Sequence, residues 1–164
     1  MFVRRYEASV FRLALSILGD PAEANEITQE TFIAALRSLR SYQEKQSLKA
    51  WLYTIALNRS RSHLRKQQVI ERLTNGLAAH FRIETQKQVT PEDTILRGEQ
   101  GSEVWRALAQ LDERHRLVVT LRYFHELPIR EIAEILSISE GTVHSRLHNA
   151  REKLRTALNH LHGE

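Results

Sequence analysis

The chain has 164 residues, of which 41% are hydrophobic and 27% are charged, values typical of a globular protein with one or two small domains. The absence of cysteine excludes disulfide scaffolds, thiolate zinc sites, iron–sulfur clusters and cysteine nucleophiles. No apolar run is long enough to span a membrane, and residues 11–19 form a short segment that contains Arg12, which argues against a secretory signal. We therefore expect a cytoplasmic protein with no membrane insertion.

Apolar side chains recur at helical spacing, and no stretch alternates apolar and polar residues for long enough to predict a strand, so the pattern predicts an all-α protein. The first helix ends at Gly19. Asp20, Pro21 and Glu23 then suit the N-cap, the first helical position and a capping box of a second, antiparallel helix. The core stripe of the first helix is Tyr6, Val10, Leu13 or Ala14, and Ile17. That of the second is Ile27, Phe32, Leu36 and Leu39.

A third helix begins near Ser47 or Leu48, after the polar stretch 41–47, and turns basic beyond Ala56. Its core stripe is Leu48, Leu52, Ile55 and Ala56. Residues 48–90 hold eight Lys or Arg against two acidic side chains, a net charge of +6, so the rest of the chain carries −2. Such a basic segment favours binding to a polyanion, either nucleic acid or an acidic membrane surface, although a solvated helix face has the same pattern.

From about Gln67 to Gly98 the apolar periodicity weakens, and the breakers at 75–76 and 90–91 predict a linker, within which residues 70–81 could still be helical. A second set of helices follows, one of them capped by Asp112 and a short one opened by Pro128. Their apolar positions are Val104, Leu108 and Leu111; Leu117, Val118, Leu121 and Phe124; Ile129, Ile132, Ala133 and Leu136; and Val143, Leu147, Ala150, Leu154 and Leu158. The turn at 137–139 between the last two helices predicts a helix-turn-helix.

The outer face of the last helix is made of small and hydrogen-bonding residues with basic flanks, which suits a DNA major groove. The face consists of Gly141, Ser145, His148, Asn149 and Glu152, with His144 and Arg151 on one flank and Arg146 and Lys153 on the other. Ser139 can cap this helix, whose free amides would favour a phosphate. The alternative is a solvated helix on a four-helix domain.

Two blocks, residues 13–32 and 50–59, resemble conserved region 2 of bacterial RNA polymerase sigma factors of the extracytoplasmic-function group. Residues 131–148, with the phrase Ile-Ser-Glu-Gly-Thr-Val followed by Ser-Arg-Leu-His, resemble their region 4. The helix-turn-helix alone is also similar to response-regulator transcription factors, but the helical front half favours the sigma family. The resemblance implies two small helical domains, a region 2 domain at 1–69 and a region 4 helix-turn-helix domain at 99–164, joined by a linker at 70–98.

The resemblance also implies a function: the protein would bind core RNA polymerase and direct promoter-specific initiation. The second helix would dock on the polymerase through Glu23, Asn25, Glu26, Gln29 and Glu30, although first-turn acids also favour the helix dipole. The third helix and the polar loop before it, residues 41–47, would open the minus-ten region. The candidate residues are Asn58, Arg59, Arg61, His63, Arg65 and Lys66, with Trp51 either stacking on a base or buried in the core. The last helix would read the minus-thirty-five element through Ser139, His144, Ser145, Arg146, His148 and Arg151.

The resemblance further implies promoter DNA and an anti-sigma factor as partners, with no cofactor and no enzymatic activity. His144 and His148 are spaced as two metal ligands could be, but we expect no metal because the pair lies where DNA should bind. Four other histidines are expected at the surface: His115, His125, His160 and His162. Two alternatives stay open, a stand-alone helix-turn-helix regulator that acts without polymerase and a basic protein of membrane surfaces.

Overall fold

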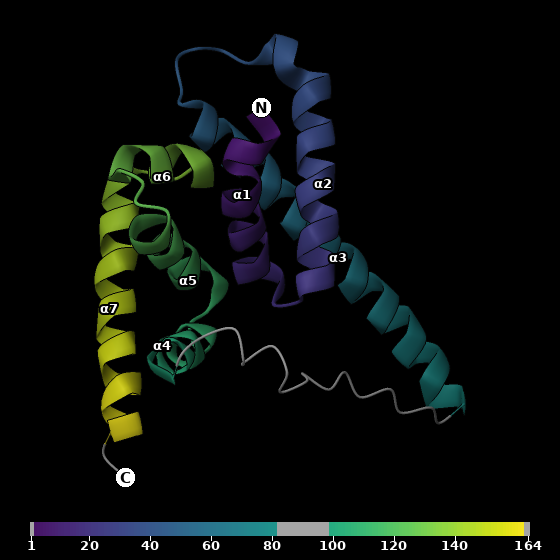
Figure 1. Cartoon of the computed structure of the whole chain (residues 1–164). Coiled ribbons are helices and arrows are strands. Elements are labelled where there is room, and N and C mark those ends of the chain that lie inside the picture. Colours follow the sequence, from purple (N-terminus) through teal and green to yellow (C-terminus); the bar gives the residue numbers. More distant parts are fainter. Residues whose placement is uncertain (1, 82–98, 163–164) are drawn as a thin grey trace.

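The computed structural model describes residues 2–81 and 99–162, which form helices and contain no strand (Figure 1). The first half comprises α1 (Phe2–Leu18), α2 (Pro21–Ser38), the 3-10 turn η1 (Leu39–Ser41) and α3 (Leu48–Phe81). The second half comprises α4 (Glu99–Ala109), α5 (Glu113–Val119), the π-helical turn η3 (Thr120–Phe124), α6 (Ile129–Leu136) and α7 (Glu140–His162). The all-α prediction is confirmed. Residues 82–98, most of the expected linker, lie outside the described residues.

The turn between α1 and α2 has the predicted chemistry. Gly19 has a positive φ of 73°, which glycine adopts without steric cost, and the Asp20 carboxylate accepts a hydrogen bond from the backbone N–H of Glu23 at 2.9 Å. The core stripe predicted for α2 is wrong in its last turns, because Leu36 and Leu39 are 60% and 50% exposed. Small side chains on the neighbouring face bring the helices together instead: Ala24, Thr28, Thr31 and Ala35 are buried beside Ile27 and Phe32.

The long helix α3 is buried only in its first part. Leu52, Tyr53 and Ala56 are fully enclosed, whereas Val69, Ile70 and Leu73 are exposed. Figure 1 shows the C-terminal part of α3 projecting away from the other helices. α3 therefore continues without a break through residues 70–81. From the sequence alone, this segment could have been either a helix or an irregular part of the linker.

The second half departs from prediction where α5 passes into η3. The backbone N–H of His125 donates to the Thr120 carbonyl, five residues back, and this wider turn rotates the following side chains. Phe124, predicted to be buried, is 45% exposed, while His125, predicted at the surface, is buried. His115, also predicted at the surface, is buried, and its Nδ1 pairs with the Asp112 carboxylate. Asp112 does not cap an α5 amide with its side chain, contrary to the prediction.

The helix-turn-helix is confirmed. Ser137 adopts a left-handed conformation with φ 55°, and the Ser139 hydroxyl accepts a hydrogen bond from the Thr142 backbone N–H at 3.1 Å, which caps α7. Val143, Leu147 and Ala150 face the core of this half.

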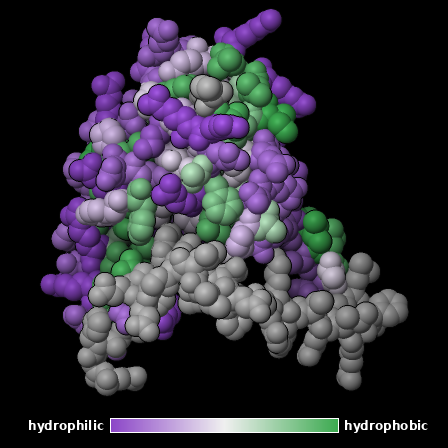
Figure 2. All heavy atoms as spheres, viewed as in Figure 1, coloured by the Kyte–Doolittle hydropathy of each residue, from purple (hydrophilic) through white to green (hydrophobic). Residues whose placement is uncertain are grey.

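The two halves pack against each other. α3 contacts α6, and α1 contacts both α5 and η3, so that one cluster of buried apolar side chains runs from Val10 in α1 to Ala150 in α7. The face seen in Figure 2 is largely hydrophilic, with apolar side chains only in small patches. In the part of the chain that the structure describes, no helix is both long and apolar enough to cross a bilayer.

Candidate nucleic-acid interface

The basic residues predicted to contact the minus-ten region lie along α3, and several of them have acidic partners within the chain. Arg59 Nη1 lies 3.7 Å from Glu30 Oε2, and Arg61 Nε donates a hydrogen bond to Glu113 Oε1 at 2.8 Å. His63 Nε2 lies 3.6 Å from a Glu23 carboxylate oxygen. The other three members of the predicted set are exposed: Asn58, Arg65 and Lys66.

The five residues predicted to dock on polymerase separate into two groups. Glu23 and Glu30 turn toward α3, where Glu23 pairs with His63 and accepts a hydrogen bond from Gln67, and Glu30 pairs with Arg59. The others lie exposed on the outer surface of α2: Asn25, Glu26 and Gln29. The structure thus does not bring the five onto one surface.

The outer surface of α2 continues into apolar side chains that sequence reasoning did not assign to a site. Ile33 and Leu36 are 50% and 60% exposed, and they lie four and seven residues after Gln29, on the same side of the helix. We call this exposed stripe of Asn25, Gln29, Ile33 and Leu36 the α2 outer stripe. Its spacing was visible in the sequence, but Leu36 fitted a core position equally well.

Trp51 is a core residue that supports the polar loop 41–47. Its ring packs against that of Tyr42, with centroids 5.2 Å apart, and the side chain is 9% exposed. The Tyr42 hydroxyl donates to the carbonyl of Gln46 at 2.8 Å, and the amide of Ala50 donates to the Ser47 hydroxyl at 3.1 Å. The Tyr42–Trp51 pair therefore supports the loop on its buried side, and polar side chains form the exposed surface of the loop.

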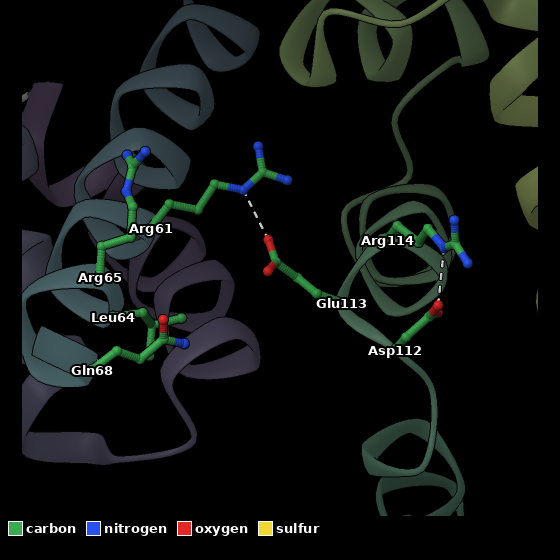
Figure 3. Close-up of a pocket in the computed structure, with 7 residues that line it drawn as sticks. All are labelled: Arg61, Leu64, Arg65, Gln68, Asp112, Glu113 and Arg114. Carbon is green, nitrogen blue, oxygen red and sulfur yellow. Dashed lines mark hydrogen bonds and ion pairs between the residues drawn. The ribbon is translucent and has the colours of Figure 1, made fainter. Parts of the chain in front are cut away.

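A groove of about 530 Å³ lies between α3 and the start of α5 (Figure 3). Its lining residues are Arg61, Leu64, Arg65, Gln68, Asp112, Glu113 and Arg114. The hydrogen bond from His115, with a second one from Arg114, lowers the pKa of Asp112 to about 2, so this carboxylate is ionised at neutral pH. Glu113 points across the groove to Arg61 of α3, whereas Asp112 points to Arg114 (Figure 3). The two walls of the groove come from residues about 50 positions apart in the sequence, so no local pattern predicts it.

A second contact between the halves is buried. The Tyr53 hydroxyl lies 2.6 Å from His125 Nδ1, and Lys49 Nζ donates to the His125 carbonyl at 2.7 Å. Burial raises the pKa of Tyr53 to about 12 and lowers that of His125 to about 4, with Lys49 and Arg12 adding to the decrease. Both side chains are therefore neutral at pH 7.

The predicted reading face of α7 is open. His144, Ser145 and His148 are exposed, and Arg146 is half-buried, whereas the hydroxyl of Ser139 is used in the helix cap. Arg151 Nε donates to the Tyr123 hydroxyl at 2.8 Å, and its guanidinium lies 5.8 Å from the centre of the Tyr123 ring. Sequence reasoning missed Tyr123, because its partner lies 28 residues away on another element.

No group of three or more His, Asp or Glu side chains is arranged to hold a metal ion within residues 2–81 and 99–162. Within these residues, no third side chain joins His144 and His148 to complete a metal site.

Comparisons with known proteins cover both halves. Residues 2–69 match the family described as Sigma-70 region 2, and residues 102–154 match Sigma-70, region 4. The chain is 34% identical over 162 residues to the ECF RNA polymerase sigma factor SigW of Bacillus subtilis, which covers 95% of this chain and 86% of that protein. It is 32% identical to the RNA polymerase sigma-H factor of Pseudomonas aeruginosa, over 96% of this chain and 84% of that protein.

Solved structures agree in fold. The sigma factor RpoE in complex with the anti-sigma factor NepR from Bartonella quintana aligns with a TM-score of 0.79 at 22% identity, over 96% of this chain and 94% of that one. CnrH in complex with the cytosolic domain of CnrY aligns with a TM-score of 0.71 at 23% identity, over 96% and 85%.

Regions 2 and 4 in this order define a transcription initiation factor of the sigma-70 type. The chain belongs to the extracytoplasmic-function group of that family, the RNA polymerase sigma factors that bind core polymerase and direct promoter-specific initiation of transcription.

Proposed function

We propose that the two halves divide the work of initiation. Residues 1–69 bind core polymerase and open the minus-ten region, residues 99–164 read the minus-thirty-five element, and residues 70–98 join them. The observation that carries this division is the occurrence of region 2 and region 4 in one chain, in that order. Sigma factors are regulatory proteins, and we infer that this one adds recognition and melting, uses no cofactor and leaves the chemistry of RNA synthesis to the polymerase.

Docking on core polymerase is assigned to the α2 outer stripe together with Glu26. The stripe combines hydrogen-bonding amides with exposed apolar side chains, the composition expected of a protein interface with a desolvated centre. Glu23 and Glu30 instead pair with basic residues of α3, so we assign them to holding that helix in position.

Promoter opening is assigned to the polar loop 41–47 and the basic face of α3. Opening a duplex needs a surface that compensates for lost base stacking, together with cations that follow the single strand. Arg65 and Lys66 are exposed and supply positive charge, while Asn58, Arg59, Arg61 and His63 precede them on the same helix. The buried pair of Tyr42 and Trp51 makes the loop a shaped surface.

Recognition of the minus-thirty-five element is assigned to α7. His144, Ser145 and His148 present polar tips to base edges, and Arg146 and Arg151 supply cations for phosphates. The capped start of α7 at Ser139 favours a phosphate as well.

We further propose an anti-sigma factor as a partner. Two proteins that share this fold are each seen in a complex: RpoE with the anti-sigma factor NepR, and CnrH with the cytosolic domain of CnrY. The protein would act in the cytoplasm, where a bacterial promoter and polymerase meet.

Transcription by purified bacterial core polymerase on a library of promoter fragments tests the proposal. Transcripts that need both the protein and particular minus-ten and minus-thirty-five sequences are expected. Tight binding to duplex DNA without polymerase binding would instead favour a stand-alone helix-turn-helix regulator.

The docking surface has its own test. Leu36→Glu places a charge in the α2 outer stripe and should weaken core polymerase binding at least tenfold. Val104→Glu is the matched control, since Val104 is an exposed apolar residue of α4 in the other half. Equal affinities of the two variants would contradict the assignment.

A further inference from the structure

The C-terminal part of α3 carries exposed apolar side chains that none of the assigned roles uses. Gln67 still reaches α2, where it donates a hydrogen bond to Glu23. Beyond it, Val69, Ile70 and Leu73 are 54%, 61% and 64% exposed, on a stretch of helix that projects away from the other helices (Figure 1). Their spacing places them on one side of the helix. We call these three residues the α3 apolar stripe.

Basic side chains border the α3 apolar stripe. At about 100° per residue, Lys66 lies in line with the stripe, one turn before it, while Arg65 and Arg72 lie on the flank next to Val69. Glu71 lies on the opposite side of the helix. All four charged side chains are exposed. A helix with an apolar face bordered by Lys and Arg has the composition of helices that lie in the interface of an anionic bilayer.

An anionic lipid surface accounts for both features of this helix, whereas other occupants account for one. DNA would bind the cations through its phosphates, but phosphates gain nothing from exposed apolar side chains. A second copy of the chain would bury the stripe, but it would bring the same three cations of each copy together, which is unfavourable. In a lipid leaflet, apolar side chains enter between the headgroups and the cations meet lipid phosphates.

We propose that the C-terminal part of α3 is a lipid-binding surface through which the protein binds reversibly to an anionic membrane. No helix within residues 2–81 and 99–162 can cross a bilayer, so α3 lies on the membrane surface and does not span it. Arg65 and Lys66 are also assigned to promoter DNA, so a membrane-bound chain cannot use them for promoter opening. This consequence rests on the proposed function of α3, and lipid binding itself does not.

Co-sedimentation of the full-length protein with vesicles tests the binding. The protein should sediment with vesicles of equal parts phosphatidylglycerol and phosphatidylcholine, and should stay in the supernatant with vesicles of phosphatidylcholine alone. Higher salt should weaken the binding, because each cation near an anionic leaflet strengthens it about fivefold. Equal binding to both kinds of vesicle, or binding to neither, would overturn the proposal.

A change of one apolar side chain separates the stripe from the general attraction of a basic protein to anionic vesicles. Leu73→Gln leaves the charge unchanged and should lower the affinity for the anionic vesicles about fivefold, because about half of a leucine side chain is no longer transferred from water. Val104→Gln is the matched control, since Val104 is an exposed apolar residue of α4. Equal affinities of the two variants would show that charge alone drives the binding and would overturn the role of the stripe.

The cations have a matched pair of their own. Arg72→Gln should lower the affinity for anionic vesicles about fivefold. Arg4→Gln makes the same change of charge at an exposed position on α1 and should bind like the parent protein. An equal loss in both variants would contradict a defined lipid-binding surface on α3.

Sedimentation equilibrium without vesicles tests a second copy as the occupant of the stripe. The protein should be monomeric. A dimer that Leu73→Gln dissociates would overturn the proposal, because the stripe would then be covered by the chain itself.

Transcription separates lipid binding from the proposed function. Anionic vesicles added to the free protein before core polymerase should reduce promoter-dependent transcripts, and the reduction should be smaller for Leu73→Gln, each protein being compared with its own activity without vesicles. Vesicle binding without any such reduction would contradict the shared use of Arg65 and Lys66. An absence of transcripts under all conditions, with vesicle binding as expected, would contradict the proposed function and leave the lipid-binding surface supported.

Discussion

The hydroxyl of Tyr53 on α3 lies 2.6 Å from Nδ1 of His125, which follows η3, although 72 residues separate the two. Both side chains are neutral at pH 7. Burial, with the nearby charges of Lys49 and Arg12, keeps the pKa of His125 at about 4, below its ordinary value of 6.5. A proton on this imidazole would place a third positive charge in a buried site, beside the charges of Lys49 and Arg12.

We therefore predict that acid separates the halves. A histidine whose pKa is lowered in the closed form stabilises that form above pH 6.5, and the stabilisation is lost as the pH falls from 6.5 toward 4. Tyr53 stays neutral throughout, since its pKa is about 12. Between pH 7.5 and pH 5 the ratio of open to closed protein should rise about thirtyfold, which corresponds to about 2 kcal/mol. Spin-label distances across the halves, recorded at both pH values, measure the ratio.

The control for acid opening is His160→Gln, because His160 is exposed on α7 and its removal should leave the pH profile intact. Replacement of His125 by Phe should flatten the profile between pH 5 and 7.5. A profile that persists unchanged in His125→Phe would contradict the assignment to this histidine.

Local signals predicted most of the elements, and the errors arise where distant parts of the chain meet. The cap by Asp20, the turn after Ser137 and the helix-turn-helix all depend on a few neighbouring residues, and each was found from the sequence. The burial of His125 depends on Tyr53 and on the wide turn η3, neither of which leaves a periodic signal.

The candidate site shows the same division. The basic run on α3 and the polar face of α7 are visible in composition and spacing. The pairing of Arg61 with Glu113, and of Arg151 with Tyr123, joins residues 52 and 28 positions apart, so only the packed structure brings them together. Leu36 was misplaced because an apolar side chain at helical spacing fits a core and a docking surface equally well.

The charges of Arg65 and Lys66 should be needed for promoter opening and not for polymerase binding. Both side chains are exposed on α3, away from the α2 outer stripe. The double variant Arg65→Glu and Lys66→Glu replaces attraction by repulsion toward a DNA strand and should lower the yield of open complex at least tenfold, while core affinity changes less than twofold. Permanganate reactivity of unpaired thymines measures the opening.

The control for the charge reversal is the double variant Arg4→Glu and Arg5→Glu, which changes two adjacent exposed arginines of α1. This pair carries the same change in net charge and should open promoters normally. An unchanged open-complex yield in the α3 variant would contradict its role.

Tyr123 should position Arg151 for a phosphate. Arg151→Ala removes a cation and should lower the salt dependence of promoter binding by about one counterion. Tyr123→Phe keeps the ring under the guanidinium but loses the hydroxyl that accepts from Arg151, so we expect affinity to fall about threefold with an unchanged salt slope. The double variant should bind like Arg151→Ala alone, because both changes act through one arginine. Additive losses in holoenzyme binding would show that Tyr123 acts independently of Arg151.

His148 should help to select the minus-thirty-five sequence. Its side chain is exposed on α7, one turn after His144, where a recognition helix meets base edges. A base-specific contact is worth about 1–3 kcal/mol of discrimination, so His148→Ala should reduce the preference of the holoenzyme at one position of the element at least fivefold and leave binding to other positions unchanged. His160→Ala, near the end of the same helix, is the control and should select the parent sequences. Transcription from a pool of promoters randomised across the minus-thirty-five element measures both, and identical selected sequences for His148→Ala and the parent would remove His148 from the reading face.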